Sequence, residues 1–516
     1  MQANKKANLL LILSVVALLV ALGLAVFFGW KAWEVYRVRN TVVEIWEAPE
    51  GMQIATEKHM ATATEKRRPM ELVLSPSMKV TVNGTETPVY ETNVSLDHLE
   101  SGALPNQSRT PVVYFDFKGQ VTVEVEVSEM ELTTAKIMPT SAGIVPTVSG
   151  NTVSFTLTEP GDYTLEFNDS FKRAMHIFTN LPDPDAEKYA AGGENIIYYG
   201  PGEYKTDSIK LESGQTLYVA GGAVIHGSIL VDHAENVKIL GRGIIDGSLY
   251  GGDANDRAVR IPINISESNN VEVEGLMLLS PNAWVLQGYI ATDVTVDRVK
   301  IISSRANGDG ITLQSCVNFH VEDCFVRSWD DSLVVKNYQR SSDNITFERV
   351  QIWTDIAQSM EVGYETNKGN IENATITNVL FKDITVLYNF HKPVMSIHNS
   401  DNAHISGVTF ENITVEHADM SYGDALIEIQ VNQSGWSTTL ERGSIDGVHI
   451  KNVDVLDTTH QRLSAVVEGY GNDHFVENVI FEDITIKGEK VDSFMGALEF
   501  ITSDRNTSGI YLRTGE

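Results

Sequence analysis

Three aspartates lie in two short motifs that follow one another closely in the chain. The first motif is Asn-Gly-Asp-Gly, which contains Asp309, and the second contains Asp330 and Asp331, so that Asp309 and Asp330 are 21 residues apart. Carboxylates that are brought together repel one another, and at least one then keeps its proton to a higher pH. A protonated carboxyl beside ionised ones can perform general acid–base chemistry, such as the cleavage of a glycosidic bond. The alternative is that these are solvated turn carboxylates, because Asn-Gly-Asp-Gly is also ordinary turn sequence.

A repeat in the surrounding sequence predicts the element that brings these aspartates together. Units in which Asn or Asp precedes an alternating apolar strand are separated by 34, 23, 25, 26, 29 and 29 residues, and they begin at Asn236, Asn270, Asp293, Asn318, Asn344, Asn373 and Asn402. One unit cannot bury its apolar face, whereas stacked units share a continuous core. Leucine-rich repeats need a leucine pattern that is absent, and propeller blades need longer units. We therefore expect an all-β fold in which residues 190–516 form a parallel β-helix of about nine or ten coils.

The coil length predicts where the aspartates lie. Asp309 and Asp330 are about one coil apart, which places them on one face of adjacent coils, roughly 4.8 Å from each other. Successive residues of a strand point to opposite faces, so Asp330 and Asp331 share a groove only if the backbone bends there. Gly308 and Gly310 permit an irregular backbone around Asp309.

The N-terminal part of the chain predicts three further segments. Residues 7–30 contain no charged residue, and a helix of that length, about 36 Å, spans roughly 30 Å of hydrocarbon. We expect an uncleaved membrane anchor, or alternatively a signal peptide, so that the catalytic part lies outside the cell or is secreted. Residues 31–69 are mixed and polar and predict a stalk. Residues 70–185 contain short alternating strands such as Val121–Val127 and predict a β-sandwich domain.

Composition excludes some classes of partner. The chain has 39 Lys and Arg against 69 Asp and Glu, a net charge of −30. Such an acidic protein repels a phosphate backbone, so we expect no nucleic-acid partner. Hydrophobic residues make up 42% and charged residues 21% of the chain, as in ordinary globular proteins. The two cysteines, Cys316 and Cys324, either pair across a turn or are separate buried side chains.

The motifs resemble those of a known group of enzymes. With Asn-Gly-Asp-Gly, Trp-Asp-Asp-Ser-Leu-Val-Val-Lys and the Gly-rich segments at 198–204, 214–223 and 241–247, the chain resembles the polygalacturonases of glycoside hydrolase family 28 and the dextranases and isopullulanases of family 49. Those families have an Asn-Thr-Asp-Gly rung followed about one coil later by an Asp-Asp rung. The resemblance implies a right-handed, pectin-lyase-like β-helix. The preceding β-sandwich is similar to the dextranase layout.

The resemblance also implies roles for the aspartates. Asp330 would be the general acid, and Asp309 and Asp331 would activate the attacking water. Both families invert the anomeric centre, so acid and base should be about 6.5–9.5 Å apart to leave room for that water. The resemblance implies no metal and no organic cofactor, and the partner is a polysaccharide or oligosaccharide substrate.

Departures from the family pattern bear on that substrate. Polygalacturonases carry Gly-His-Gly one coil after the paired Asp and an Arg-Ile-Lys motif, whereas this chain has no His in 357–363 and has Asn-Phe-His-Lys-Pro at 389–393. We therefore expect a neutral glucan or a differently decorated polysaccharide. Candidate substrate-binding residues, each with an ordinary structural role as the alternative, are Asn307, Trp329, Lys336, Glu361, His391 and Lys392, followed by Trp284, Trp353 and Glu365.

Two other functions remain open beside an extracytoplasmic, inverting glycoside hydrolase. A polysaccharide lyase would need a Lys or Arg base, usually with Ca²⁺. A non-catalytic, glycan-binding β-helix would bind sugar without the three aspartates. The sequence indicates no oligomeric state.

Overall fold

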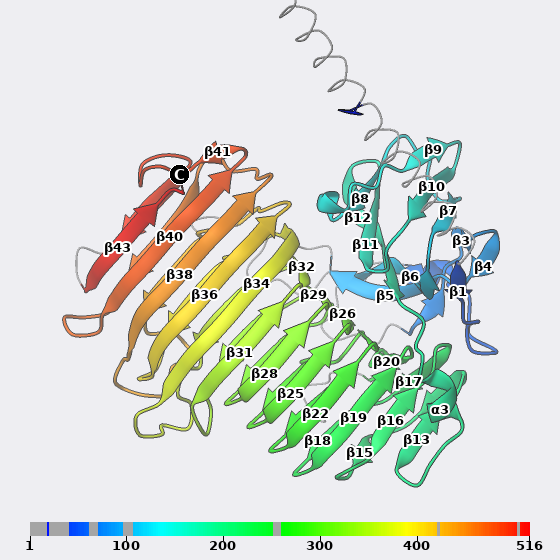
Figure 1. Ribbon diagram of the computed structural model, residues 1–516, viewed down its shortest axis with the longest axis horizontal. Coiled ribbons are helices and arrows are strands. Elements are labelled where there is room, and N and C mark those ends of the chain that lie inside the picture. The colour runs from blue at the N-terminus through cyan, green and yellow to red at the C-terminus, as the bar shows by residue number, and fades with distance from the viewer. Residues whose placement is uncertain are drawn as a thin grey trace, which may run out of the picture.

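The computed structural model describes residues 18–19, 41–60, 71–95, 107–250, 260–420, 424–502 and 506–515. A two-sheet unit at the N-terminal side is followed by a long solenoid (Figure 1). The segment predicted to enter a membrane, residues 7–30, lies outside the described residues except for Leu18 and Leu19. Among the helices that are described, none is both long and apolar enough to cross a membrane.

The N-terminal unit consists of two sheets that share one core. Pairing is antiparallel except between β6 and β12. In β7 every second side chain is buried, as the alternating sequence predicts. The inner faces meet in one cluster that includes Val123, Phe155, Phe115 and Leu165. The seven-stranded sheet comprises β1 (Val42–Glu44), β2 (Val73–Leu74), β5 (Tyr90–Ser95), β6 (Gln107–Lys118), β8 (Ala135–Met138), β11 (Asp162–Phe167) and β12 (Ser170–Asn180). The five-stranded sheet comprises β3 (Met78–Val82), β4 (Thr85–Thr87), β7 (Val121–Val127), β9 (Thr147–Ser149) and β10 (Thr152–Leu157).

Part of the predicted stalk belongs to this unit. β1 pairs antiparallel with β6. Trp46 stacks on Tyr114 with ring centroids 5.3 Å apart, and Val43 packs against the core shared by the two sheets. Residues 41–60 therefore form the first strand and a segment that packs on the sheets through side chains such as Val43 and Trp46, rather than a free stalk, although Val42 and Ile54 are exposed. Short helical segments are α2 (Glu57–Met60), the 3₁₀ turn η1 (Thr140–Ala142) and α3 (Ala186–Ala190).

The solenoid is a parallel β-helix. Each coil adds two short strands, or one long bent strand, to a 20-stranded sheet and one strand to an 11-stranded sheet. The second sheet thus counts eleven coils, slightly more than the repeats predict. The 20-stranded sheet comprises β13 (Ile196–Tyr199), β14 (Gly202–Lys205), β16 (Thr216–Val219), β17 (Ala223–His226), β19 (Glu235–Gly241), β20 (Ile244–Asp246), β22 (Asn269–Glu274), β23 (Met277–Leu279), β25 (Thr292–Asp297), β26 (Lys300–Ile302), β28 (Val317–Glu322), β29 (Phe325–Ser328), β31 (Ser342–Glu348), β32 (Gln351–Thr354), β34 (Thr375–Asn389), β36 (His404–Val415), β38 (Ser444–Val455), β40 (Val476–Ile486), β41 (Glu489–Lys490) and β43 (Thr507–Arg513). The 11-stranded sheet comprises β15 (Ile209–Leu211), β18 (Ile229–Asp232), β21 (Ile263–Ser266), β24 (Leu286–Tyr289), β27 (Ile311–Gln314), β30 (Leu333–Lys336), β33 (Met360–Tyr364), β35 (Met395–Asn399), β37 (Ile427–Val431), β39 (Leu463–Glu468) and β42 (Leu498–Thr502).

The repeated Asn residues sit where the chain adopts a left-handed backbone. Asn318 and Asn344 have φ of 53° and 55°, a conformation that Asn tolerates better than most residues. The Asn318 amide donates to Asp293 at 2.8 Å, and the Asn344 amide donates to Asn318 at 2.8 Å. This ladder explains the repeat, because each coil needs the same residue type at the same corner.

The two cysteines do not form a disulfide. Cys316 and Cys324 are both free and both buried in the core of the solenoid. Burial raises the pKa of each thiol to about 12. The second alternative from the sequence, two separate buried side chains, is therefore the observed one.

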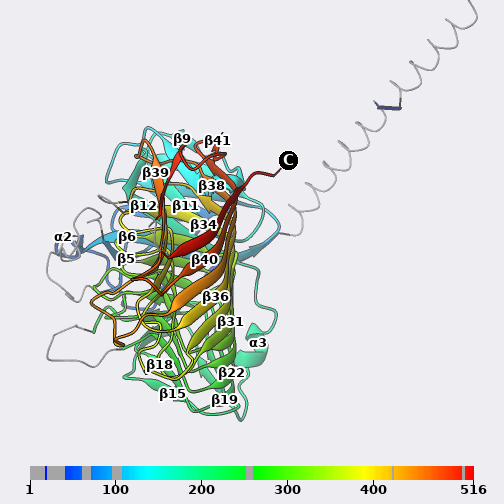
Figure 2. The same ribbon diagram turned by 90° about the vertical axis from the view of Figure 1, so that its left-hand side faces the viewer.

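The N-terminal unit packs against the strands that lead toward the aspartates. One buried cluster joins Tyr90 and Phe178 of the unit to Phe325 and Trp353 of the solenoid. The Arg327 guanidinium lies 3.1 Å from Nε2 of His176. β29, which carries Phe325 and Arg327, runs directly into the connection that holds Asp330. Figure 2 views the solenoid from its C-terminal end, with β43 and β40 in front of the stacked coils.

Candidate active site

The stacking of β27 on β30 brings the two aspartate motifs together. Ile311 pairs with Leu333 in parallel register. The residues two positions earlier, Asp309 and Asp331, therefore occupy equivalent places in adjacent coils, and Gly310 N–H donates to the Asp331 carbonyl at 2.8 Å. Asp330 precedes this equivalent position by one residue, because the offset from Ile311 to Leu333 is 22 residues whereas Asp309 and Asp330 are 21 apart. Both aspartates still lie on adjacent coils at one pocket.

Close packing explains the glycines beside Asp309. A Cβ on Gly310 would lie 2.4 Å from Cγ1 of Val326, and one on Gly308 would lie 2.6 Å from the Arg305 carbonyl oxygen. The left-handed residue of the motif is Asn307, with φ of 58°. Gly310 thus allows close approach of the neighbouring coil, and Gly308 allows a tight turn against Ser303 and Arg305 of its own coil, rather than an unusual φ.

Asp330 and Asp331 lie in the short connection between β29 and β30, where the chain is not extended. The Ser328 hydroxyl donates to the Asp330 carbonyl at 2.6 Å, and Asp331 N–H donates to Asp330 Oδ1 at 3.1 Å. This bend turns both carboxyls toward one pocket, as the sequence requires for two successive residues. Asp331 also accepts a hydrogen bond from Gln358 N–H at 3.2 Å.

All three aspartates line one pocket of about 160 Å³. Its wall comes from four coils and from a later loop. The lining residues are Trp284, Asn307, Asp309, Asp330, Asp331, Lys336, Gln358, Tyr364, Glu365 and Trp436.

Burial and mutual repulsion favour the protonated carboxyls. Burial, and then the charges of Asp330 and Asp331, raise the pKa of Asp309 well above its usual range. Burial and then Asp330 raise the pKa of Asp331 to about 8, and burial raises the pKa of Asp330 as well. Groups that interact this strongly titrate as a unit. The cluster therefore holds at least one proton near neutral pH.

One buried cation opposes this effect. Nζ of Lys336 lies 2.9 Å from Glu365, and both side chains are about nine-tenths covered. Burial disfavours the ammonium, but Asp309, Glu365 and Asp331 outweigh it and raise the pKa of Lys336 above its usual range. Lys336 in turn lowers the pKa of all three catalytic candidates.

A second ionic network lies beside the pocket wall. His398 is 1% exposed, and its Nδ1 lies 2.9 Å from Glu361 and its Nε2 2.9 Å from Glu428. Burial opposes the charge on the ring, but Glu361 and Glu428 raise the pKa of His398 to about 10. The ring of Tyr364 stacks on His398 with centroids 4.4 Å apart. The Tyr364 hydroxyl accepts a hydrogen bond from Gln358 at 3.1 Å.

The candidate binding residues from the sequence divide into two groups. Asn307, Lys336, Trp284 and Glu365 line the pocket. The other five do not. Glu361 lies behind the wall with His398, Lys392 forms an ion pair with Asp424 at 3.1 Å, and Trp353 is wholly buried against the N-terminal unit. The last two of these five candidates, Trp329 and His391, are likewise not among the residues that line the pocket.

The sequence interpretation missed four residues of the site. Gln358 and Tyr364 could have been found by continuing the register from Asp331 to the next coil. His398 lies one coil further than the rung in which a His was sought. Trp436 comes from a loop two coils after β33, and its neighbours in the sequence give no signal of the pocket. Among the described residues, no group of three or more His, Cys, Asp or Glu is arranged to hold a metal ion.

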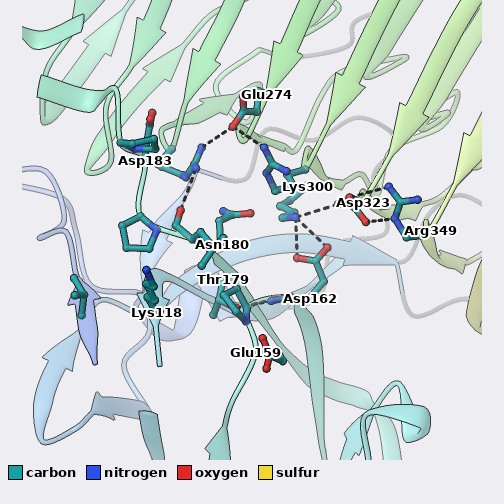
Figure 3. Close-up of a pocket in the computed structure, with 18 of the residues that line it drawn as sticks. Lys118, Glu159, Asp162, Thr179, Asn180, Asp183, Glu274, Lys300, Asp323 and Arg349 are labelled. Atoms are coloured by element: carbon teal, nitrogen blue, oxygen red, sulfur yellow. Dashed lines mark hydrogen bonds and ion pairs between the residues drawn. The ribbon is translucent and has the colours of Figure 1, made fainter. Parts of the chain in front are cut away.

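A larger cavity of about 820 Å³ lies elsewhere, between the N-terminal unit and the solenoid (Figure 3). Its charged side chains pair with one another. Lys300 lies 2.9 Å from Asp162, Arg298 lies 2.9 Å from Glu274, and the guanidinium of Arg349 contacts Asp323 at 2.8 Å. The pair of Lys300 with Asp162 joins the solenoid to the N-terminal unit, whereas the other two pairs lie within the solenoid. The cavity is therefore part of the interface between the two units.

Comparison with known proteins identifies the family of this chain. The model of glycosyl hydrolases family 28 matches residues 201–500, more than half of the chain. A Vitis vinifera protein named "Probable polygalacturonase" is 24% identical over 192 residues, which cover 30% of this chain and 39% of that protein. The match thus spans well under half the length of this relative.

Two solved structures are similar to this chain. Dex49A from Penicillium minioluteum is similar over 91% of this chain and 98% of its own, with 15% identity and a TM-score of 0.57. An exopolygalacturonase from Thermotoga maritima is similar over 63% of this chain and 86% of its own, with 17% identity and a TM-score of 0.45. At 15% identity the likeness to Dex49A concerns the fold alone.

Proposed function

This chain belongs to glycosyl hydrolases family 28 and is a glycosidase, and we propose that it hydrolyses a polysaccharide by the inverting route. The observation that carries the proposal is the convergence of Asp309, Asp330 and Asp331 on one pocket. Their raised pKa values keep a proton in the cluster that can serve as the donor, while Lys336 favours the ionised form of the neighbouring carboxyls.

We assign the general acid to Asp330, which is the least buried of the three. Its proton passes to the glycosidic oxygen as the bond from the anomeric carbon to that oxygen breaks. A water molecule adds its oxygen to the anomeric carbon from the opposite side and gives a proton to Asp309 or Asp331. Because the three carboxyls titrate together, a proton held by the cluster is available to the one that faces the leaving oxygen.

We propose that the substrate is uncharged at the cleaved sugar. Asp309, Asp330, Asp331 and Glu365 contribute four carboxyls to the pocket, and among its described lining residues Lys336 is the only cation. Lys336 is already paired with Glu365 at 2.9 Å. A uronate would therefore bring another negative charge to a site without a cation left to receive it.

The same ion pair argues against a lyase. A lyase base must lose its proton before it can take one from the substrate, whereas the pKa of Lys336 is raised and the ammonium is held by its carboxylate neighbours. For hydrolysis the ammonium only has to stay charged. The site therefore favours the hydrolase over this alternative.

Two further parts of the proposal concern the rest of the chain. We propose that the two-sheet N-terminal unit is a β-sandwich domain that holds β29, and with it Asp330, in place. Its support is the contact between His176 and Arg327. We also propose that the protein acts outside the cytoplasm, with residues 7–30 as anchor or signal segment, on the strength of their apolar sequence.

The test is a screen of the full chain for new reducing ends on dextran, pullulan, polygalacturonate, arabinan and xylan. The proposal predicts release from a neutral polymer and little from polygalacturonate. Proton NMR of the first product should show the anomer opposite to that of the substrate linkage. A product that absorbs near 235 nm, which marks elimination, would contradict hydrolysis.

A further inference from the structure

The loop that carries Trp436 is unusually long for its place in the coil. The corner between β35 and β36 has four residues (400–403), whereas the corner between β37 and β38 has twelve (432–443). Near the middle of this loop the Trp436 side chain is 63% exposed. Large aromatic side chains that are left in solvent commonly mark a binding surface.

A buried aspartate holds this loop in a fixed shape. Asp401 is 0% exposed, and its Oδ1 accepts hydrogen bonds from Thr438 N–H at 2.7 Å and from Thr439 N–H at 2.8 Å. Its Oδ2 accepts from Asn367 N–H at 3.3 Å. The Ser437 hydroxyl donates to the Ser400 carbonyl at 2.6 Å. Trp436 is therefore presented by an anchored loop rather than by a loose one.

The loop reaches back along the solenoid to the reaction centre. β37 is two coils beyond β33 and four beyond β27 in the 11-stranded sheet. At roughly 4.8 Å per coil, the loop covers about 10–20 Å of the groove in the direction of the earlier coils. Trp436 consequently lines the same pocket as Asp309 and Asp330. It stands on the C-terminal side of the aspartates, while Trp284, from the coil before β27, stands on the other side.

The pocket at the aspartates is small. Its volume is about 160 Å³, whereas pockets for drug-sized ligands hold roughly 300–1,000 Å³. That volume suits about one sugar ring, whose apolar face can lie against a flat indole. A polymer that continued past the aspartates toward the C-terminal coils would meet Trp436 at the pocket wall.

We propose, as an extension of the hydrolase function above, that Trp436 closes the groove and stacks on a terminal sugar, so that the enzyme removes units from chain ends. Trp436 is then a specificity-determining residue, and the 432–443 loop decides between cleavage at ends and cleavage inside the polymer. The bond that is cleaved and the roles of the three aspartates stay as in the proposed function.

The experiment follows the products that the full chain forms early from a neutral polysaccharide that it hydrolyses. A single small product from the start and an unchanged viscosity are expected. A cross-linked form of the same polymer, whose ends are few, should be degraded much more slowly. Trp436→Ala should raise KM about tenfold, the factor that corresponds to one aromatic stacking contact, and should yield a ladder of longer products. Trp436→Phe should keep the single product.

Leu440→Ala is the matched control, because Leu440 lies fully exposed in the same loop and does not line the pocket. It should leave KM and the product pattern unchanged. A ladder of oligosaccharides from the wild-type chain, or a Trp436→Ala variant with unaltered KM and products, would overturn the inference and leave hydrolysis intact. No release of sugar from any polymer would instead overturn the proposed function itself.

Discussion

Replacement of Lys336 tests the electrostatics of the site. Lys336→Met keeps the length of the side chain and removes the cation that opposes the raised pKa values of Asp309, Asp330 and Asp331. For any two unit charges about 7 Å apart in a medium with an effective dielectric constant of about 20, the interaction amounts to about 2.4 kcal/mol, or between one and two pH units. Loss of the cation disfavours the ionised carboxyls, so every pKa in the cluster should rise.

The assay is the pH dependence of kcat/KM on the hydrolysed polymer. The base carboxylates must be ionised and the acid protonated, so both limbs of the bell-shaped profile should move toward alkaline pH by about one to two units. The variant leaves Glu365 without its partner at 2.9 Å. The double variant Lys336→Met with Glu365→Gln also removes a charge that raises the pKa of Asp330, so it should bring back the part of the shift that arises at Asp330.

Lys392→Met is the control, because Lys392 forms its ion pair with Asp424 and does not line the pocket. Its profile should match that of the wild type. A Lys336→Met profile that stays in place, or that moves toward acid, would refute the assignment of these three carboxyls as the titrating groups of the reaction.

Two predictions concern stability. The pKa of His398 is raised from 6.5 to about 10, so the stability that its charge contributes is fully present below about pH 6.5 and is lost as pH rises through 10. In urea unfolding, His398→Gln should lower the free energy of unfolding by about 3 kcal/mol at pH 6, and the difference from the wild type should narrow toward pH 10. A difference that does not depend on pH would contradict the ion network. Lys300→Met breaks the buried pair with Asp162 at 2.9 Å and should cost about 3–5 kcal/mol, whereas adding Asp162→Asn should recover part of the loss; equal losses in the single and the double variant would argue against the ion pair as the cause.

The repeat could be predicted from the sequence because each coil meets the same requirement at the same corner. The ladder from Asn318 to Asn344 is local and periodic. The predicted repeat position Asn373 does not continue this ladder. The left-handed residue that stacks on Asn344 is Asn378, whose amide donates to Asp343 at 2.8 Å. A longer preceding loop moves the position by five residues, and spacing alone does not reveal this.

The site could be predicted only in part, for the same reason. Asp309, Asp330 and Asp331 are signalled by residue type and by spacing within two coils. For Trp353 the sequence leaves substrate binding and a structural role open. The structure shows the structural role, because Trp353 packs against the N-terminal unit, whose docking leaves no mark in the sequence around it. Trp436 reaches the pocket through a loop two coils beyond β33, and such contacts between distant coils follow from three-dimensional packing alone.

The most direct measurement is the rate of hydrolysis by Asp330→Asn on the polymer that the wild-type chain cleaves. The amide has nearly the same shape as the carboxyl but cannot act as the acid. The account predicts that kcat falls by about 10²–10⁴-fold, while circular dichroism and sugar binding stay close to those of the wild type. Unchanged turnover in this variant would contradict the assignment of the chemistry to these aspartates.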